Sequence, residues 1–514
     1  MKAGSRISDG LRRTAWAACL ALAVFTLYCV FFRAHGLNRK EFDFSNLVYA
    51  GCGAALMLAA YALTRWWNRV RHDRMVIALG CVALFVLQRC ITHLVIFGTG
   101  WDAVDVVNFA WRIASGGECT DWENLYLSNY TNNELMILLY AACIRLRMLF
   151  GAELVRRDVL LTLTVLNSLV SSVGAYLVYR CVQMVSREKR TALLAWLAYC
   201  ALIGLSPWFL IPYSDSLALF FPVLILYVYL NKRIWRGKWP MIGALSYLGF
   251  QIKPSVAIVL IAIAILETLD AMRRGKTGAF VRRLSAVLAV MLALHAGYMA
   301  IPTERVGWKI DPQKRMVITH YLMMGLNEEN LGGYLEADVN YSCSFPTVEQ
   351  RKKANLAAAA ERLKAMGPAG YMSFLADKNA VNFHDGTFAW GKEGGFMRVI
   401  FDVEETRPIR ILRSVFYPDG DRHHHLMNVL QLLWMGTLLG HAFALLDGRA
   451  GKKELLVMHL CVAGITLFTL IFESRARYLY VFVPVIIVAA SLGYECAAKR
   501  IGRLMNRTSK SGNV

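Results

Sequence analysis

Long apolar runs recur along most of this 514-residue sequence, and they constrain its fold more than any other feature. Each run has about 18–25 residues, enough for one helix to cross a hydrocarbon core roughly 30 Å thick. Only 18% of the residues are charged and 57% are hydrophobic, with a mean hydropathy of +0.41. We therefore predict an all-α polytopic membrane protein. The runs fall near 14–33, 45–64, 75–97, 134–150, 158–180, 191–211, 214–231, 241–267, 283–301, 427–446, 455–472 and 478–497.

The formal net charge of +21 comes from basic residues that gather in short connectors between the runs. Cytoplasmic loops of membrane proteins carry such an excess of Lys and Arg. No basic face with interleaved aromatic residues accompanies them, so the charge does not indicate nucleic-acid binding. The connectors are 65–74, 186–190, 231–239, 273–283, 447–453 and the tail 498–507.

This sidedness places two long segments, 98–133 and 302–425, outside the cytoplasm and divides the chain into four parts. We expect an N-terminal transmembrane hairpin, a transmembrane core that includes the first external loop, an extracytoplasmic loop domain, and C-terminal transmembrane helices with a cytoplasmic tail. These parts cover residues 1–74, 75–301, 302–426 and 427–514 respectively.

Two runs do not fit a simple crossing. The run 241–267 has basic residues at both ends and is interrupted by "IKPS", where Pro254 removes a backbone donor and disfavours helix at Lys253. Two half-helices that meet near the outer leaflet would satisfy both facts. The run 134–150 ends in Arg145 and Arg147, so we expect it to dip into the membrane or lie shallow.

The stretch "GTGWDAVDVV" places Asp102 and Asp105 three positions apart, just after an apolar run. At this spacing both carboxylates can share one face of a helix start. They could accept a proton from a hydroxyl, hold a divalent cation, or simply cap the helix. The spacing alone leaves these alternatives open. The residues that follow, with Val104, Val107 and Trp111 at helical spacing, predict an amphipathic helix in the interface plane.

Other ionisable residues interrupt apolar sequence on the predicted outer side, where a charge is costly unless it is paired. Asp215 in "PYSDSLALFF" is either an N-cap or a cavity residue, and Lys253 either pairs with an aspartate or faces a lipid phosphate. In "FESRARYLYVFVPV", Arg475 and Arg477 form an external cationic pair against the positive-inside trend. Arginine forks match phosphate oxygens, which favours a functional role.

The large external segment predicts further structure. The stretch 346–367 opens with a Pro–Thr cap signal and closes on Gly367, which predicts a helix. His320, His384 and Asp385 lie in Gly- and aromatic-rich stretches that suit either sugar binding or ordinary loop folding. The only cysteines in polar loops, Cys119 and Cys343, could form a disulfide if both loops are external. The cluster "RHHH" at 422–425 is more typical of an interfacial basic anchor than of a metal site.

The order of these motifs carries a family resemblance. The external acidic pair, "NYTNNELMILL", "PYSD", "LGFQIKPS" and "ESRARYLYVFVP" follow one another as in the GT-C superfamily of integral membrane glycosyltransferases. The chain resembles most the bacterial members that modify cell-envelope polymers, such as the protein O-mannosyltransferase and aminoarabinose transferase types. The resemblance covers about residues 75–500 and implies a GT-C-like bundle of about 11–13 transmembrane helices with two extracytoplasmic loops.

The resemblance also implies roles for residues. The acidic residue of the first external loop is catalytic, which implies Asp102 with Asp105 as the second carboxylate. The adjacent acidic pair of the O-mannosyltransferases is here separated as "DAVD", so the choice of base stays open. The implied donor-phosphate residues are Lys253, Arg475 and Arg477, and the predicted substrate cavity contains Asp215, Tyr213, His320, Glu473 and Tyr478.

These observations predict an inverting glycosyltransferase in the cell membrane, with its active site on the extracytoplasmic side. It would move a sugar from a polyprenyl-phosphate donor to an envelope glycan or polymer, with no required cofactor and a divalent cation as an option. A polyprenyl-linked glycan transporter or flippase is the alternative. Transporters often contain internal repeats and unwound helices at the midplane. Here no repeat is apparent, and the charged groups gather at one face instead.

Overall fold

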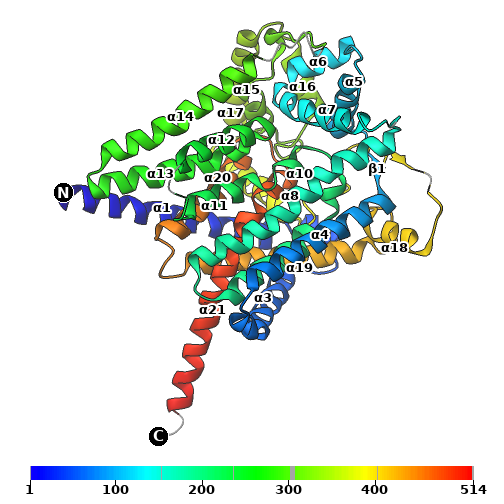
Figure 1. Ribbon diagram of the computed structural model, residues 1–514. Coiled ribbons are helices and arrows are strands. Elements are labelled where there is room, and N and C mark those ends of the chain that lie inside the picture. Colours follow the sequence, from blue (N-terminus) through cyan, green and yellow to red (C-terminus); the bar gives the residue numbers. More distant parts are fainter. Residues whose placement is uncertain (1, 152, 235–236, 301–306, 402, 512–514) are drawn as a thin grey trace.

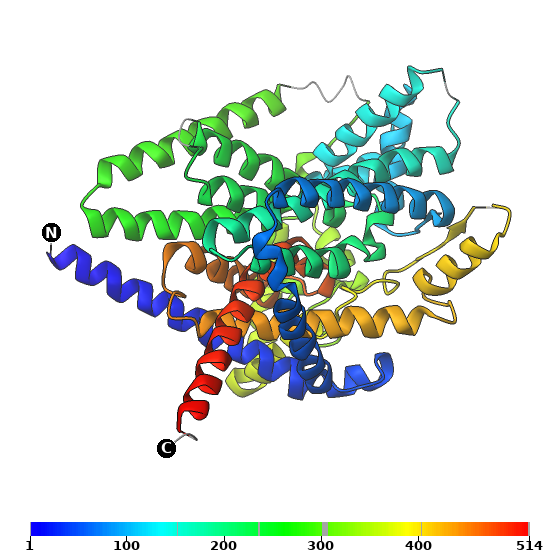
Figure 2. The ribbon, with the colours of Figure 1, turned by 60° about the horizontal axis from the view of Figure 1, so that its bottom comes forward.

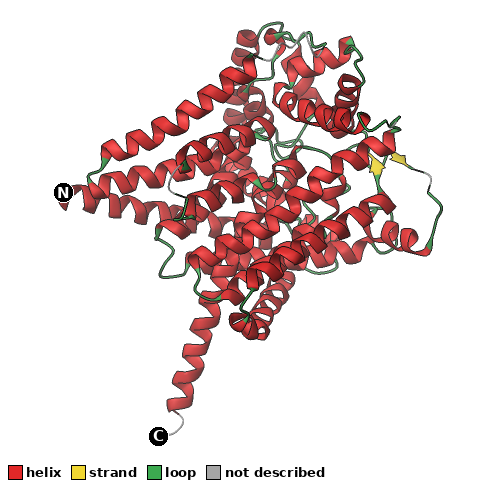
Figure 3. Cartoon of the chain, in the orientation of Figure 1, coloured by secondary structure: helices red, strands yellow, loops and turns green. Residues whose placement is uncertain are grey.

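The protein is almost entirely helical, as a chain of apolar runs in lipid must be. The structure, a computed structural model, describes residues 2–151, 153–234, 237–300, 307–401 and 403–511. Within these ranges the strands are the short antiparallel pair β1 (Phe97–Gly98) and β2 (Val399–Ile400) (Figure 3). The predicted domain boundary at 301–302 lies outside the described residues.

Nine helices in the described part of the chain are long and apolar enough to cross a membrane. A shorter apolar helical stretch covers Ser214–Leu230, and the all-α polytopic fold is confirmed, with fewer spanning helices among the described residues than the 11–13 expected. The long helices are α1 (Lys2–Tyr28), α3 (Asn46–Leu63), α4 (Asp73–Val95), α8 (Arg156–Val185), α13 (Ala257–Arg274), α14 (Thr277–Met299), α19 (His423–Leu445), α20 (Lys453–Ile471) and α21 (Val483–Ser511). Shorter helices include α9 (Lys189–Tyr199), α11 (Phe221–Leu230) and α12 (Lys238–Ile252).

The remaining helices form a layer at one end of the bundle, together with the β pair. In Figure 1 most of the long helices run from lower left to upper right, and α5, α6 and α7 gather at the upper right. We call this end the site end. Its helices are α5 (Asp102–Ala114), α6 (Asp121–Asn129), α7 (Glu134–Met148), α15 (Ile318–Met324), α16 (Glu336–Cys343), α17 (Val348–Phe383) and α18 (Arg407–Phe416), while the short α2 (His35–Glu41) and α10 (Ser214–Ala218) connect longer helices.

The predicted cytoplasmic connectors all lie at the opposite end, which we call the basic end. Ion pairs join them there: Arg12 of α1 pairs with Asp270 of α13, and Lys453 of α20 pairs with the same aspartate at 3.1 Å. Lys189 reaches Asp73 at 2.8 Å, at the starts of α9 and α4. The chain therefore alternates between the two ends as the charge pattern predicts (Figure 2).

The break in the first irregular run is confirmed, and the shallow position of the second stays a prediction. The run 241–267 breaks at Lys253, whose φ and ψ of −148° and 110° are extended, between α12 and the turn Pro254–Val256 that opens α13. The run 134–150 forms α7, which packs on α5 in the site-end layer. The break places Lys253 between two helix ends, where its N–H donates to Gly249 of α12 and its carbonyl accepts from Val256 of the next turn.

The helix expected over 346–367 begins where predicted. The Thr347 hydroxyl accepts a hydrogen bond from the backbone N–H of Gln350, and Gln350 Oε1 accepts one from the backbone N–H of Thr347, which forms a capping box. Gly367 interrupts α17 with a φ of 62°, a left-handed conformation that glycine adopts without strain. A second helical stretch, which the sequence did not predict, then starts at Pro368 and continues to Phe383.

Helix α5 is amphipathic as predicted, but its buried face is wider than expected. Val107 is buried together with Ala103, Val106 and Ala110, whereas Val104 and Trp111 are half-buried, and the helix packs on α7. That α5 lies in the interface plane stays a prediction. Cys119 and Cys343 are both free thiols, so the structure contains no disulfide between the two external loops.

Candidate active site

Asp102 and Asp105 occupy the first turn of α5 at the site end. Tyr213, just before α10, donates a hydrogen bond from its hydroxyl to Asp102 Oδ2 at 3.2 Å. The rings of Trp101 and Tyr213 meet edge to face with centroids 4.8 Å apart. Acidic residues in a first turn also complement the helix dipole, so the position itself serves both a structural and a chemical role. What distinguishes Asp102 is its contact with a second segment that carries charges.

That segment contains Asp215, which is fully buried in α10. Lys253 at the helix break forms an ion pair with Asp215 Oδ1, and its ammonium lies 4.9 Å from the centroid of the Tyr478 ring. The sequence left open whether Lys253 pairs with an aspartate or faces a ligand, and the structure shows the pairing. Because Pro254 breaks the helix, the lysine can extend from the gap between α12 and α13 to α10.

Arg477 lies at the centre of the charged groups, in the turn before α21. Its Nε is 3.5 Å from Asp215 Oδ2 and 3.7 Å from Glu393 Oε1. Its guanidinium carbon is 4.6 Å from the centroid of the Trp101 ring, a distance suited to a cation–π contact. Among the described residues its buried Nη1 has no hydrogen-bond partner. A buried donor without a partner is rare and costly, so this atom points to something the site holds in use.

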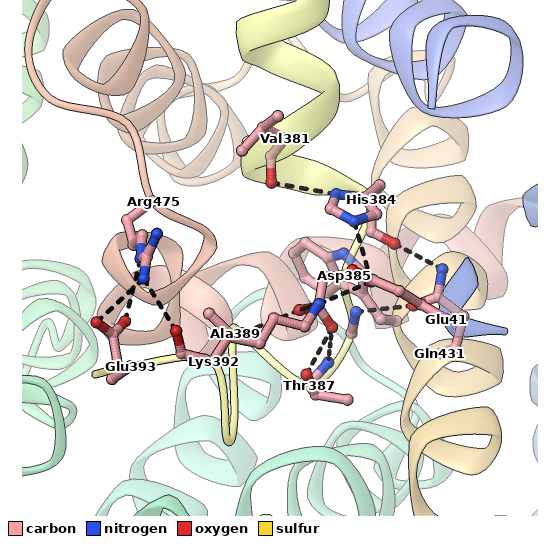
Figure 4. Close-up of polar contacts among 12 residues, drawn as sticks. Glu41, Val381, His384, Asp385, Thr387, Ala389, Lys392, Glu393, Gln431 and Arg475 are labelled. Atoms are coloured by element: carbon pink, nitrogen blue, oxygen red, sulfur yellow. Dashed lines mark hydrogen bonds and ion pairs between the residues drawn. The ribbon is translucent and has the colours of Figure 1, made fainter. Parts of the chain in front are cut away.

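Glu393 is a residue of the site that the sequence did not indicate. It lies in the segment "GKEGG" and accepts from Arg475 in a two-bonded fork, with Nε–Oε1 at 3.1 Å and Nη2–Oε2 at 3.2 Å (Figure 4). One signal for it was present, an acidic residue among glycines in the large external segment. Its connection to the arginines depends on tertiary structure. We call Asp215, Lys253, Glu393, Arg475 and Arg477 the site cluster.

Burial and charge shift the protonation of the carboxylates around the cluster. Burial raises the pKa of Asp102, against the lowering effects of Arg477 and the Tyr213 hydrogen bond. Burial, followed by the Asp102 charge, raises the pKa of Asp105 to about 6. Burial also raises the pKa of Glu473. For Glu393, Arg477 and Arg475 outweigh the effect of burial and lower the pKa.

The segment that carries Glu393 is anchored beside the cluster by a second polar network. Lys392 Nζ pairs with Glu41 at 2.7 Å and with Asp385 at 2.8 Å (Figure 4). Asp385 also accepts from the Thr387 backbone N–H at 2.8 Å and from that of Ala389 at 3.0 Å. The predicted loop residues His384 and Asp385 thus hold a turn together, a role in loop folding.

This turn contains strained backbone. Phe388 and Ala389 are buried and have φ values of 57° and 62°, in the left-handed region that costs side-chain-bearing residues of order 1–2 kcal/mol each. After the Glu393 tip, β2 pairs with β1 and returns the chain to within a few residues of Asp102. Such strain persists where the surroundings fix it and is frequent at functional sites.

Of the predicted site residues, the structure brings together all but one. Glu473 and Tyr478 interact at the start of the segment that carries both arginines. His320 lies elsewhere: it is buried, and its Nδ1 is 2.7 Å from Ser342 Oγ of α16. The neighbouring Tyr321 is electrostatically coupled to Asp102 and Glu473 instead. Because α15 is helical, the side chains of adjacent residues point about 100° apart, so His320 and Tyr321 lie on different faces of the helix.

Fold and site define a multi-pass helical membrane protein with a charged cluster at one end of its bundle. The chain belongs to the family described as conserved hypothetical integral membrane protein, whose match covers residues 46–498. No curated protein matches the sequence. The family confirms an integral membrane protein.

One solved structure similar to the chain is the archaeal oligosaccharyltransferase AglB from Archaeoglobus fulgidus, in complex with an inhibitory peptide and a dolichol-phosphate. The identity is 12%, the TM-score is 0.38, and the similarity covers 84% of this chain and 52% of that one. The chain thus spans about half the length of the archaeal protein.

Proposed function

We propose that this chain is a membrane glycosyltransferase that moves a sugar from a polyprenyl-phosphate donor to a glycan or polymer of the cell envelope. One observation carries the proposal. Asp102, a carboxylate whose pKa is raised by burial, is joined through Tyr213 to Arg477, which lies in a group of three cations with Lys253 and Arg475. Glycosyl transfer from a lipid phosphate needs a carboxylate base beside cations that bind the phosphate.

The proposed reaction is a direct displacement. A hydroxyl of the acceptor attacks the anomeric carbon of the sugar, and the bond from that carbon to the phosphate oxygen breaks. The electron pair of the broken bond stays on the phosphate, where Lys253, Arg475 and Arg477 stabilise the charge. The hydroxyl proton goes to the catalytic carboxylate, which acts as general base. Attack from the side opposite the phosphate inverts the anomeric centre.

Asp102 is the better candidate for the base. It lies against the cluster through Tyr213, while Asp105 is one helical turn further and is influenced by Glu123 of α6. In our proposal Asp105 orients the acceptor. Within the described residues no group of three or more His, Cys, Asp or Glu is arranged to hold a metal ion. The proposal requires no cofactor and leaves a divalent cation as an option.

The donor side of the site fits a lipid substrate. Lys253 lies where α12 and α13 meet inside an apolar run, so a polyprenyl chain could remain in the bilayer while its phosphate reaches the cluster. An ammonium and two guanidinium groups supply both a point charge and planar forks for phosphate oxygens.

A transfer assay tests the proposal. Purified protein in nanodiscs receives labelled polyprenyl-phosphate sugar and isolated envelope polymer, and labelled polymer is measured. We expect Asp102→Asn to lower kcat by about 10²-fold or more, and Asp105→Asn to lower it less. Equal activity of wild type and Asp102→Asn would remove Asp102 as the base. A wild-type protein that transfers no sugar from any polyprenyl-phosphate donor would refute the enzyme proposal, and movement of the labelled lipid across the bilayer would favour the flippase.

The location of the site on the extracytoplasmic side of the cell membrane is part of the proposal. Gly394 at the site end and Gly448 at the basic end form a matched pair, since a Cβ at either would meet no described heavy atom within 4 Å. In a background without the exposed Cys343, we expect a membrane-impermeant thiol reagent to label Gly394→Cys in intact cells and to spare Gly448→Cys. The reverse pattern would place the site in the cytoplasm.

A further inference from the structure

The arginines assigned to the donor phosphate already hold an anion in the structure. Glu393 fills the fork of Arg475 with both carboxylate oxygens and approaches Arg477 with Oε1 at 3.7 Å. A carboxylate and a phosphate use the same fork of N–H donors in the same way. Glu393 is also shielded, with its side chain only 10% exposed. It therefore occupies the place that a phosphate group would need.

The net charge of the site cluster also fits a phosphate in the place of Glu393. With Asp215 and Glu393 ionised, the three cations exceed the carboxylates by one charge. When Glu393 leaves, the excess is two, which matches the dianion that a phosphate monoester becomes as leaving group. Asp215 cannot leave in the same way, because it is fully buried in α10.

The chain is anchored on both sides of Glu393, which leaves the middle of the tip as the part that can move. Lys392, on one side, is anchored to Glu41 and Asp385, and β2 is paired with β1 on the other side. Gly391 and Gly395 border the tip with φ values of 75° and 63°. A Cβ at Gly394 would meet no described heavy atom within 4 Å, whereas Gly391 packs on Pro418 and Gly395 packs on Gly100, so the room for movement lies in the middle of the tip.

We propose that Glu393 is the resident occupant of the donor-phosphate subsite, and that the middle of the tip, residues 393–394, swings it out when a lipid phosphate binds. This inference rests on the proposed function, and it makes Glu393 a residue that sets donor affinity. The tip covers the space between the arginines and the start of α5, since Gly395 packs directly on Gly100. Its release would therefore open the cluster toward Asp102 at the same time.

Binding of undecaprenyl phosphate to the full chain in nanodiscs tests the inference. We expect Glu393→Gln, which keeps the shape and removes the charge, to bind the lipid phosphate at least about tenfold more tightly than wild type. We expect the matched control Glu405→Gln, an exposed carboxylate of the same segment, to bind as wild type does. Thermal melting of each variant verifies that it is folded, and inorganic phosphate is titrated in parallel to separate the headgroup from the lipid.

The outcomes separate the two proposals. If wild type binds the lipid phosphate and Glu393→Gln binds it equally or more weakly, the resident-occupant inference is wrong and the proposed function stands. If neither protein binds it, and Arg477→Gln does not differ from them, both proposals fail. Should Glu393→Gln unfold, Gly394→Pro offers a second route, because a stiffened tip should then weaken binding; unchanged affinity in that variant would also overturn the inference.

Discussion

The molecule contains two networks of ion pairs, one at each end of its bundle. At the basic end, Lys453 pairs with Glu267 and with Asp270, while Arg283 and Arg12 pair with one of these carboxylates each. At the site end, the cluster likewise places each carboxylate between two cations. By a count of ion pairs alone the two networks are equivalent.

They differ in what carries the carboxylates. Glu267 and Asp270 are one turn apart on α13, so their positions are fixed by a helix. Glu393 lies on a tip bordered by Gly391 and Gly395. The comparison separates a network whose carboxylates are held by a helix from one in which we propose that a carboxylate gives way to a ligand.

The strongest test of the difference between the two networks is to remove one cation from each. We expect Arg477→Gln to lower kcat/KM for sugar transfer by about 10²–10³-fold, because a donor to the developing phosphate charge is lost. Lys453→Gln should lower the melting temperature but leave kcat/KM of the folded protein within about threefold of wild type. Comparable losses of activity in both variants would contradict the distinction between the networks.

The pH dependence of transfer examines the link between Asp102 and the cluster. Because the pKa of Asp102 is raised above the ordinary aspartate value, kcat/KM should fall with decreasing pH earlier than for an unperturbed aspartate. The Tyr213 hydrogen bond lowers this pKa, so Tyr213→Phe should move the acid limb to higher pH. The measurement is the pH profile of kcat/KM for both proteins. If the acid limb lies at the same pH in wild type and Tyr213→Phe, protonation of Asp102 does not cause it.

Alanine substitutions at two neighbouring glycines test how tightly the border of the tip is packed. Gly395→Ala should lower the melting temperature by about 2–6 °C, because its φ is 63° and its Cβ would lie 2.8 Å from Gly100 Cα. Gly394→Ala has no described atom within 4 Å and should stay within about 1 °C of wild type. Equal effects at both positions would mean that the border is not packed as described.

The smallest expected effect concerns Asp105. Since its folded-state pKa is raised to about 6, the carboxyl favours the folded state when protonated, and this contribution is lost as the pH rises through about 6. Asp105→Asn should therefore raise the melting temperature by about 1–3 °C at pH 8 and give no gain at pH 4. A gain of the same size at both pH values would point to packing and not to ionisation.

Much of the fold follows from local features of the sequence. Run length and charged connectors predicted the long apolar helices and their alternation between two ends. Pro254 predicted the break at Lys253, and Gly367 predicted the interruption of α17. These predictions succeeded because lipid imposes helices on apolar runs and because proline and glycine act on their own backbone.

The composition of the site was only partly predictable. The sequence indicated Asp102, Asp215, Lys253 and Arg477 as costly charges in apolar surroundings, and their sidedness suggested one location. It did not indicate Glu393, which has glycine neighbours and no apolar run to make its charge conspicuous. It also could not show that His320 points to Ser342 of α16, because that orientation depends on the rotation of one helix.

The sequence by itself thus determined a polytopic helical bundle, its alternation and the residues whose charge demands a partner. The tertiary structure decided which partners they have: Asp215 for Lys253, Tyr213 for Asp102, and Glu393 for both arginines. The physical reason is the range of each effect. Hydrophobic length and backbone chemistry act over a few residues, whereas the Arg475–Glu393 pair joins positions 82 residues apart that only the packed bundle brings together.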